Sequence, residues 1–409
     1  MLFFGNDKYK FSWNSFSIML IFTGNAVFYT LETMPYYIAM TLTGIAISVI
    51  VNALRFNQEI QPTNYIVWLT VIYSLFFLYG LFFLRAGSFD WDGMLVRFAE
   101  NFALYLAIKG LLNERNGHVL TPFLISGVIS AVYIVVRERS DIISGGIRIG
   151  SSLSGNVNNV GFNFGFVALL VTWYYCKTKK KVYLFILMAF AIIMLLTGSK
   201  KAILILAMNL LMIFIYQKDR IGTRLKLGIA VAAGFYFVFK VPYLYDILGV
   251  RIETMIATVM GRKMTSLYSY STDMRKEMMK EAFGMFLNKP ILGGGYNYFR
   301  ANTVTQYEYS HCNYTELLCS FGIVGTMVYY SKLFSNSLYI LTTKLHRNIK
   351  YKDIGIICLI LVVEMLVVDI ATITFAGQSI GYMPIIFSSA ALDFVRMKRA
   401  FGLSCETEN

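Results

Sequence analysis

Long apolar runs, separated by short polar segments, recur along almost the whole chain. A membrane hydrocarbon layer about 30 Å thick takes about 20 apolar residues of helix to cross. About twelve runs approach this length. They are residues 14–31, 36–54, 64–84, 93–113, 118–136, 160–176, 182–197, 201–216, 224–242, 313–335, 353–372 and 379–396. The pattern predicts an all-α polytopic membrane protein with about 12 transmembrane helices.

One long polar segment, residues 243–312, interrupts the series of apolar runs. Loops of this length are usually functional or structured. Within it, the stretch DMRKEMMKEAFGMFLN (273–288) has apolar residues near helical spacing and precedes Pro290, which predicts an amphipathic helix ending before the proline. Residues 1–409 are therefore expected to form a single transmembrane domain, in which 243–312 is one long extracytoplasmic loop containing short helices.

Composition agrees with lipid-facing helices. Hydrophobic residues make up 57% of the chain and charged residues only 15%, against about 25% charged residues in soluble domains. The net charge of +14 would suggest nucleic acid in a soluble protein. Here many of the cations lie in short loops between spans, and no aromatic-plus-basic motif appears. We therefore expect contact with membrane lipid and no nucleic-acid partner.

The positions of Lys and Arg in short loops predict the orientation, because cytoplasmic loops carry an excess of these residues. Basic clusters lie at residues 176–181, 216–226, 344–352 and 396–399. They predict a multi-pass protein of the cytoplasmic (inner) membrane with both termini in the cytoplasm. Segments 137–159, 198–200 and 243–312 then face outward.

Neither a metal nor another cofactor is expected. The five cysteines have no close pairing in the sequence, so they indicate neither a metal site nor a disulfide framework. The stretch FDWDG (89–93) contains an outward Asp-x-Asp, but three letters are too short a motif to indicate a metal site.

The stretch SHCNYTELLCSFGIVG (310–325) places a polar cluster at the start of a predicted membrane helix. It contains His311, which the predicted topology makes the one outward-facing histidine, beside Asn313, Tyr314 and Glu316. An imidazole there can accept a proton near neutral pH. The alternative is a helix-start residue that makes only local hydrogen bonds.

A second outward stretch, ISGGIRIGSSLSGNVNNVGFNFG (143–165), surrounds Arg148 with Gly, Ser and Asn, including Asn156 and Asn159. Backbone N–H groups and a guanidinium in such a loop suit a phosphate group. A flexible connector with one solvated arginine is the alternative.

Two further segments add cations on the same side. Lys200 and Lys201 interrupt apolar sequence between two spans, where charges are rare, although lysines there can also extend to lipid headgroups. Arg275 lies on the predicted amphipathic helix, which is followed by NKPILGGGYNYF, where Gly293 and Gly295 permit close backbone approach or a tight turn. Three segments with cations together suit a pyrophosphate.

Two acids, Glu364 and Asp369, lie within a predicted span. Such residues could relay protons in a transporter, or they could form hydrogen bonds between helices.

The sequence resembles the O-antigen ligase / polysaccharide polymerase superfamily, whose Wzy-type members polymerise O-antigen and capsule repeat units. The resemblance extends over roughly residues 145–330. The histidine stretch is similar to the family pattern His-Asn-x-Tyr-x-Glu-Leu-Leu followed by Gly-x-x-Gly, with Cys312 where Asn is common. The matching residues are His311, Asn313, Tyr314, Glu316, Leu317, Leu318, Gly322 and Gly325.

Three more stretches carry the resemblance. RIGSSLSGNVNNVG resembles the Arg-x-Gly segment that runs into an Asn pair, through Arg148, Gly150, Asn156 and Asn159. TGSKKA resembles a Gly-Ser-Arg step, with Lys200 in place of the usual arginine. The arginine before Pro-x-x-Gly-x-Gly is matched by Arg275, Pro290, Gly293 and Gly295.

The resemblance implies a GT-C-like helical fold and a metal-independent glycan transfer from undecaprenyl pyrophosphate on the extracytoplasmic side. The implied substrate is an oligosaccharide linked to undecaprenyl pyrophosphate, and a chain-length regulator protein is a further implied partner. Arg148 and Arg275 would stabilise the leaving pyrophosphate, assisted by Lys200 or Lys201, and His311 would orient or deprotonate the acceptor hydroxyl. Glu316 is expected to orient a loop group or a sugar. The other residues expected to bind the substrate are Asn156, Asn159, Gly293, Gly295, Asn313 and Tyr314.

Repeat-unit polymerisation, as of O-antigen or capsule, is the favoured function. An O-antigen ligase, which transfers the glycan to lipid A core, has the same motifs. A flippase for lipid-linked oligosaccharides is the alternative from another class, supported by the number of spans and by the two intramembrane acids.

Overall fold

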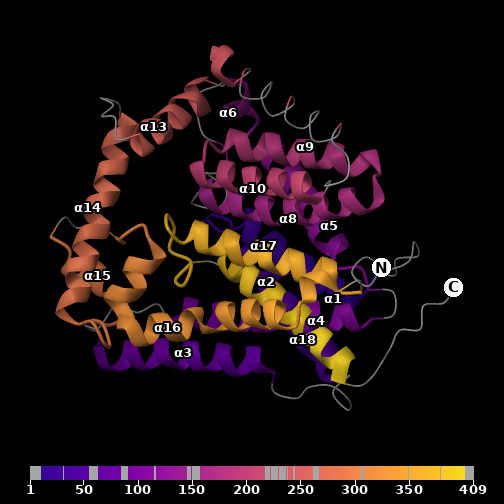
Figure 1. The fold of residues 1–409 in the computed structure, drawn as a ribbon, viewed down its shortest axis with the longest axis horizontal. Coiled ribbons are helices and arrows are strands. Elements are labelled where there is room, and N and C mark those ends of the chain that lie inside the picture. Colours follow the sequence, from indigo (N-terminus) through magenta and orange to yellow (C-terminus); the bar gives the residue numbers. More distant parts are fainter. Residues whose placement is uncertain are drawn as a thin grey trace. The chain divides into compact units, whose positions relative to one another are not determined.

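The computed structural model describes most of the chain. The described residues are 11–30, 32–54, 63–83, 91–114, 117–144, 149, 157–216, 222, 229, 236, 238–242, 245–260, 267–304, 308–348, 350–377 and 379–400. These residues form helices joined by turns, without a strand among them (Figure 1). The prediction of an all-α protein is confirmed for this part of the chain.

The long helices coincide with the predicted spans to within a few residues, except that the tenth predicted span, 313–335, continues for seven more residues. They are α1 (Trp13–Val27), α2 (Met34–Leu54), α3 (Asn64–Phe83), α4 (Trp91–Asn113), α5 (Leu120–Arg137), α8 (Val157–Thr178), α9 (Lys181–Leu196), α10 (Lys200–Tyr216), α16 (Asn313–Thr342), α17 (Lys352–Val368) and α18 (Met383–Ala400). The predicted span 224–242 lies largely outside the described residues.

Shorter helices lie between the long ones, and several fall in the long polar segment. They are α6 (Arg139–Ser144), η1 (Tyr245–Gly249), α13 (Val250–Val259), α14 (Leu267–Asn288), α15 (Tyr298–Asn302), η2 (Leu345–Arg347) and η3 (Ser379–Tyr382). Helix α14 confirms the predicted amphipathic helix, beginning earlier than expected and ending before Pro290.

Four helices in the described part are long and apolar enough to cross a membrane: α2, α3 over residues 64–81, α5 and α16. Helix α9 and residues 201–212 of α10 are shorter apolar helices. These lengths agree with a polytopic membrane protein. The full number of spans and the likeness to GT-C enzymes stay predictions.

The chain divides into two compact units. Unit 1 comprises residues 1–21, 41–119 and 274–409, and unit 2 comprises residues 22–40 and 120–273.

Unit 2 packs α8 against α10 through small residues. A Cβ atom on Gly161 would lie 2.7 Å from the Cβ of Ala202, and one on Gly165 would lie 2.5 Å from Cγ2 of Ile205. Two glycines four residues apart let helix backbones approach closely, which is a common way of associating helices in membranes. This close approach brings the N-terminal ends of α8 and α10 side by side.

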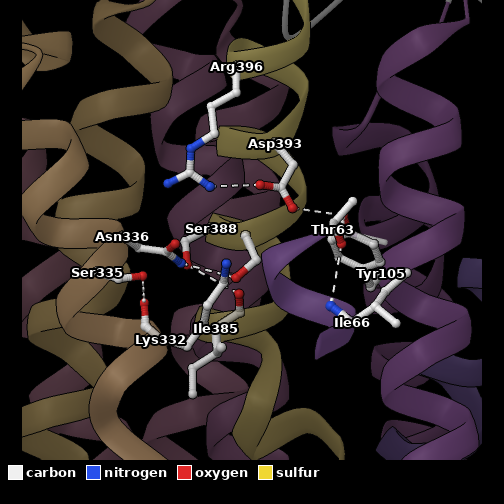
Figure 2. A network of polar contacts seen from close by, with 11 residues as sticks. Thr63, Ile66, Tyr105, Lys332, Ser335, Asn336, Ile385, Ser388, Asp393 and Arg396 are labelled. Carbon is white, nitrogen blue, oxygen red and sulfur yellow. Dashed lines mark hydrogen bonds and ion pairs between the residues drawn. The ribbon is translucent and has the colours of Figure 1, made fainter. Parts of the chain in front are cut away.

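Unit 1 joins its helices through buried polar side chains (Figure 2). The Tyr105 hydroxyl on α4 donates to Oδ2 of Asp393 on α18 at 2.8 Å, and Arg396 Nη1 donates to Oδ1 of the same carboxylate at 2.8 Å. Asn336 on α16 donates to the hydroxyls of Ser388 and Ser389, each at 3.0 Å. Buried polar groups are costly unless paired, so these bonds fix which faces of α4, α16 and α18 meet.

Candidate functional site

Helix α16 is broken at Gly322, within the stretch that the sequence analysis singled out. Gly322 has φ 63° and ψ −165°, outside the helical region. A continuous helix would bond the N–H groups of Ile323 and Val324 to the carbonyls of Cys319 and Ser320, four residues earlier. The break removes both of these bonds.

Backbone groups of the glycine loop, residues 289–295, take up the carbonyls that the break leaves open. The Gly294 N–H donates to the Cys319 carbonyl at 2.9 Å, and the Gly295 N–H donates to the Ser320 carbonyl at 2.8 Å. Buried backbone groups need such partners, because an unpaired one costs about as much as a lost hydrogen bond.

The same loop accepts from the N–H groups on the other side of the break. Ile323 donates to the Pro290 carbonyl at 2.9 Å, and Val324 donates to the Ile291 carbonyl at 3.2 Å. Two lost bonds within α16 are thus replaced by four bonds to the glycine loop, which fixes the loop to the middle of the helix.

Glycine is required on both sides of this junction. Gly293 has φ +73°, and a Cβ atom there would lie 2.5 Å from backbone atoms of Ser320, Phe321 and Gly322. A Cβ atom on Gly322, itself at φ +63°, would lie 2.3 Å from the Ile291 carbonyl oxygen. Neither backbone could tolerate a larger residue without moving.

The N–H groups of the three consecutive glycines are all used within the chain, since the Gly293 N–H donates to the Lys289 carbonyl at 3.0 Å. The structure therefore gives the loop a role in joining two elements. Contact of Gly293 and Gly295 with a substrate stays a prediction.

The junction holds α14 along the first part of α16, with α15 beside them (Figure 1). Met278 and Ala282 of α14 form a buried cluster with Phe299 of α15 and Cys319 of α16. The Cys319 Sγ lies 3.8 Å from the Met285 Sδ. The charged first part of α14 in unit 1 therefore lies toward the beginning of α16.

Arg275 and His311 both lie near Tyr309 as a result. The Tyr309 and His311 rings are in contact, with centroids 4.3 Å apart and an interplanar angle of 65°. Burial and the Glu308 carboxylate raise the pKa of Tyr309, whereas the Arg275 guanidinium lowers it, so this arginine lies within electrostatic range of the phenol. Two of the three predicted catalytic residues therefore share a neighbour that the sequence analysis missed.

His311 has an unusual backbone conformation. Its φ of 59° lies in the left-handed region, which residues other than glycine seldom adopt. The preceding residue is held in place, because the Ser310 N–H donates to Glu316 Oε2 at 2.8 Å and the Ser310 hydroxyl donates to the Cys312 carbonyl at 3.1 Å. Glu316 thus orients a loop group, which is one of the two roles considered for it. The strained backbone of His311 agrees with a functional role, because strained backbone conformations cluster at functional sites.

Asn313, the first residue of α16, connects that helix to the segment after α17. Its Nδ2 donates to the Tyr330 hydroxyl and to Asp369 Oδ2, each at 3.0 Å. Its Oδ1 accepts from the N–H groups of Thr374 at 2.9 Å and Phe375 at 3.2 Å. Two donors and two acceptor positions are all that an asparagine side chain has, so Asn313 is fully used within the chain.

Asp369 is the second centre of this connection. Its carboxylate accepts from the hydroxyls of Tyr330 at 2.6 Å and Thr374 at 2.7 Å, and its carbonyl accepts from the Asn313 N–H at 2.8 Å. Of the two roles considered for Asp369, hydrogen bonding between helices is the one seen.

Tyr314 and Glu364 differ in whether their polar side-chain atoms have hydrogen-bond partners. The Tyr314 hydroxyl donates to the Leu366 carbonyl at 2.7 Å, and its ring stacks on that of Tyr330. Glu364 is buried in α17, and its Oε1 has no hydrogen-bond partner among the described residues. A role for Glu364 in moving protons stays open.

The remaining predicted residues belong to unit 2 or lie outside the described residues. Lys200 begins α10, and Lys201 Nζ lies 5.9 Å from the centre of the Phe162 ring on α8. Asn159 is half-buried near the start of α8. These three lie at the paired ends of α8 and α10, whereas Arg148 and Asn156 fall outside the described residues. That they join Arg275 and His311 in one site stays a prediction.

A comparison with protein families finds a match, which covers the middle of the chain. Residues 183–330 match the model of a family described as O-Antigen ligase. This match supports the resemblance to the O-antigen ligase / polymerase superfamily. Its members are membrane glycosyltransferase-like enzymes that act on lipid-linked oligosaccharides. No curated protein matches the chain in a sequence search.

The O-antigen ligase match includes most of the geometry described above. It contains Lys200 and Lys201, Arg275, the glycine loop, His311 and the break in α16. Asp369, which holds the start of α16 in place, follows the matched residues in the sequence, and Asn156 and Asn159 precede them.

The helix junction predicts a large difference between two glycine substitutions. Gly293→Ala forces a side chain into a left-handed backbone and against three backbone atoms, so it should lower the free energy of unfolding by roughly 1–3 kcal/mol or more. Gly284→Ala on α14 is the matched control, because nothing lies within 4 Å of its Cβ position. Thermal unfolding of the purified protein in detergent measures both, and equal midpoints would contradict the junction.

The connection at the head of α16 predicts a second difference. Asn313→Ala leaves buried groups of Tyr330, Asp369, Thr374 and Phe375 with fewer partners, so it should destabilise the protein by at least about 2 kcal/mol. Asn302→Ala removes only an exposed bond to the Tyr298 carbonyl, and it should change stability by less than about 0.5 kcal/mol. Comparable shifts in the two unfolding midpoints would show that Asn313 does not hold this connection.

Proposed function

We propose that this protein is a polysaccharide repeat-unit polymerase of the cytoplasmic membrane. It transfers a glycan from undecaprenyl pyrophosphate onto another lipid-linked repeat unit at the extracytoplasmic face, with both termini in the cytoplasm. The observation that carries the proposal is the contact of His311 with Tyr309 inside the O-antigen ligase match, and Arg275 lies within electrostatic range of the same tyrosine.

The proposed reaction exchanges one bond at the sugar for another. An acceptor hydroxyl oxygen attacks C1 of the donor sugar, the bond from C1 to the pyrophosphate oxygen breaks, and the pyrophosphate leaves on its lipid. Negative charge builds up on the leaving group, so a fixed guanidinium beside it lowers the barrier. Arg275 has this role, and the chain's own cations make the transfer independent of a metal.

His311 receives the proton that the acceptor hydroxyl loses. A histidine is suited to this step because its pKa is ordinarily near neutral. The bonds from Glu316 to Ser310, and from Asn313 to Asp369, support a positioning role for Glu316 and Asn313. Both hold the backbone on either side of His311.

Unit 2 supplies the remaining cations in this proposal. Arg148 would form the second arm of the pyrophosphate site, with Lys200 and Lys201 assisting and Asn156 and Asn159 contacting the glycan. The pairing of the ends of α8 and α10 supports a common surface for Asn159 and the two lysines. A chain-length regulator is a proposed partner of the complete enzyme.

A ligase is the second candidate, because the matching family is described as O-Antigen ligase. A ligase would use the same donor and the same leaving group, but its acceptor would be lipid A core. A flippase would need neither Arg275 nor His311 beside a reacting bond.

Substitution of the two central side chains tests the proposal. In cells that make the glycan, His311→Ala and Arg275→Ala should each reduce the formation of long chains by about 100-fold or more. Lys276→Ala is the control, since this lysine is the next residue on α14 and is exposed. Glycan length is measured on a gel.

The glycan products that the variants still make distinguish a polymerase from a ligase and a flippase. A polymerase defect leaves single repeat units attached to their acceptor, whereas a ligase defect leaves long chains on the lipid carrier and none on lipid A core. A flippase defect removes both single units and long chains. Normal chain lengths in both His311→Ala and Arg275→Ala would overturn the proposed mechanism.

A further inference from the structure

The end of α14 and the glycine loop expose a group of large apolar side chains. Their exposed fractions are 46% for Phe283, 60% for Leu287, 66% for Ile291 and 50% for Leu292. These residues follow one another over the last turns of the helix and the start of the loop. We call them the apolar tip.

The apolar tip is separate from the face that packs in the core. Met278, Ala282 and Phe286 are the buried residues of α14 in unit 1, and the first two contact α15 and α16. Helix α14 therefore carries apolar residues on two faces at its C-terminal end. An amphipathic helix lying on a water-facing surface needs only one.

Polarity changes along the exposed face of α14. Lys276, Glu277 and Lys280 are exposed on the earlier turns, and Phe283 and Leu287 follow on the later ones. Lys276 and Leu287 are eleven residues apart, which is about 16 Å along a helix. Asn288 and Lys289 are also exposed, and the Lys289 Nζ lies 4.9 Å from the centre of the Tyr298 ring. A change from charged to mainly apolar side chains over this distance is typical of a segment that passes from water into hydrocarbon.

The hydrogen bonds at the break in α16 set the depth of the apolar tip. The loop bonds to α16 at Gly322, nine residues after the start of the helix, or about 14 Å along its axis. Helix α16 is long and apolar enough to cross a membrane. Helix α16 has 30 residues and is about 45 Å long. When such a helix is centred on a hydrocarbon layer about 30 Å thick, Gly322 and the loop bonded to it lie about 6 Å inside the layer.

We propose that residues 283–292 re-enter the membrane and that the apolar tip contacts the acyl chains of bilayer lipids. The sequence alone suggested that all of segment 243–312 lies outside the membrane, and this inference moves part of it inside. It depends on α16 spanning the membrane and not on the proposed chemistry.

The backbone of the loop meets the requirement of such a location. Non-helical backbone is tolerated at membrane depth only where its polar groups are satisfied by protein. The carbonyls of Pro290 and Ile291 accept from α16, and the N–H groups of Gly294 and Gly295 donate to it. The same bonds that repair the broken helix thus shield these four polar groups of the loop from hydrocarbon.

Spin labels on single introduced cysteines test the location in the full chain. Leu287→Cys and Ile291→Cys are labelled in protein reconstituted into phosphatidylcholine and phosphatidylglycerol vesicles, with Lys276→Cys as the matched position on the earlier turns. The chain with its native cysteines only, treated in the same way, gives the background. Collision rates with oxygen, which concentrates in hydrocarbon, and with a water-soluble nickel chelate are then measured by electron paramagnetic resonance.

The inference predicts that nickel collisions fall several-fold from residue 276 to residues 287 and 291, while oxygen collisions rise. Equal nickel access at all three positions would show a water-exposed loop and would overturn it. A second copy of the chain covering the apolar tip would produce spin–spin broadening at residues 287 and 291 that disappears on dilution with unlabelled protein. This result would also overturn the inference. The spin-label measurements need no donor substrate. A negative result for membrane re-entry can therefore be distinguished from a negative result for the proposed polymerase activity.

Discussion

The exchange of backbone hydrogen bonds between the break in α16 and the glycine loop is the constraint on which the candidate site depends. A helix that is broken at Gly322 leaves two carbonyls and two N–H groups without partners unless another segment supplies them. Residues 290–295 supply all four partners. Because the loop is fixed there, α14 must run along the first part of α16, and its charged turns must lie near the beginning of that helix. This packing agrees with the electrostatic effect of Arg275 on Tyr309, whose ring contacts His311.

A second set of bonds gives the beginning of α16 its rigidity. Asn313 uses its whole side chain to hold the helix start against the segment that follows α17, and Asp369 completes the connection. Glu316 holds Ser310, which precedes the strained backbone of His311. An imidazole that must face a reacting hydroxyl benefits from such support, since a small displacement of a catalytic group can cost much of its effect. The polar residues around the histidine are thus explained largely by positioning.

Sequence patterns predicted the helices well, because the length of an apolar run measures directly what a membrane crossing requires. They also predicted α14, whose apolar spacing and following proline are local signals. The role of the glycines was not accessible, because nothing local to residues 293–295 indicates that their partners lie around Gly322. The bond between Asn313 and Asp369 joins residues 56 positions apart and has no local signal either. Tyr309 is one of 28 tyrosines, and only its contact with His311 distinguishes it.

The donor pyrophosphate is proposed to bind beside Arg275. An experimental map of the full chain in a lipid nanodisc with its undecaprenyl-pyrophosphate-linked oligosaccharide would test this claim most directly. The claim predicts the pyrophosphate within about 3 Å of the Arg275 guanidinium, a hydrogen-bonding distance, with the first sugar facing His311. A pyrophosphate bound at the other end of α16, away from both side chains, would contradict it.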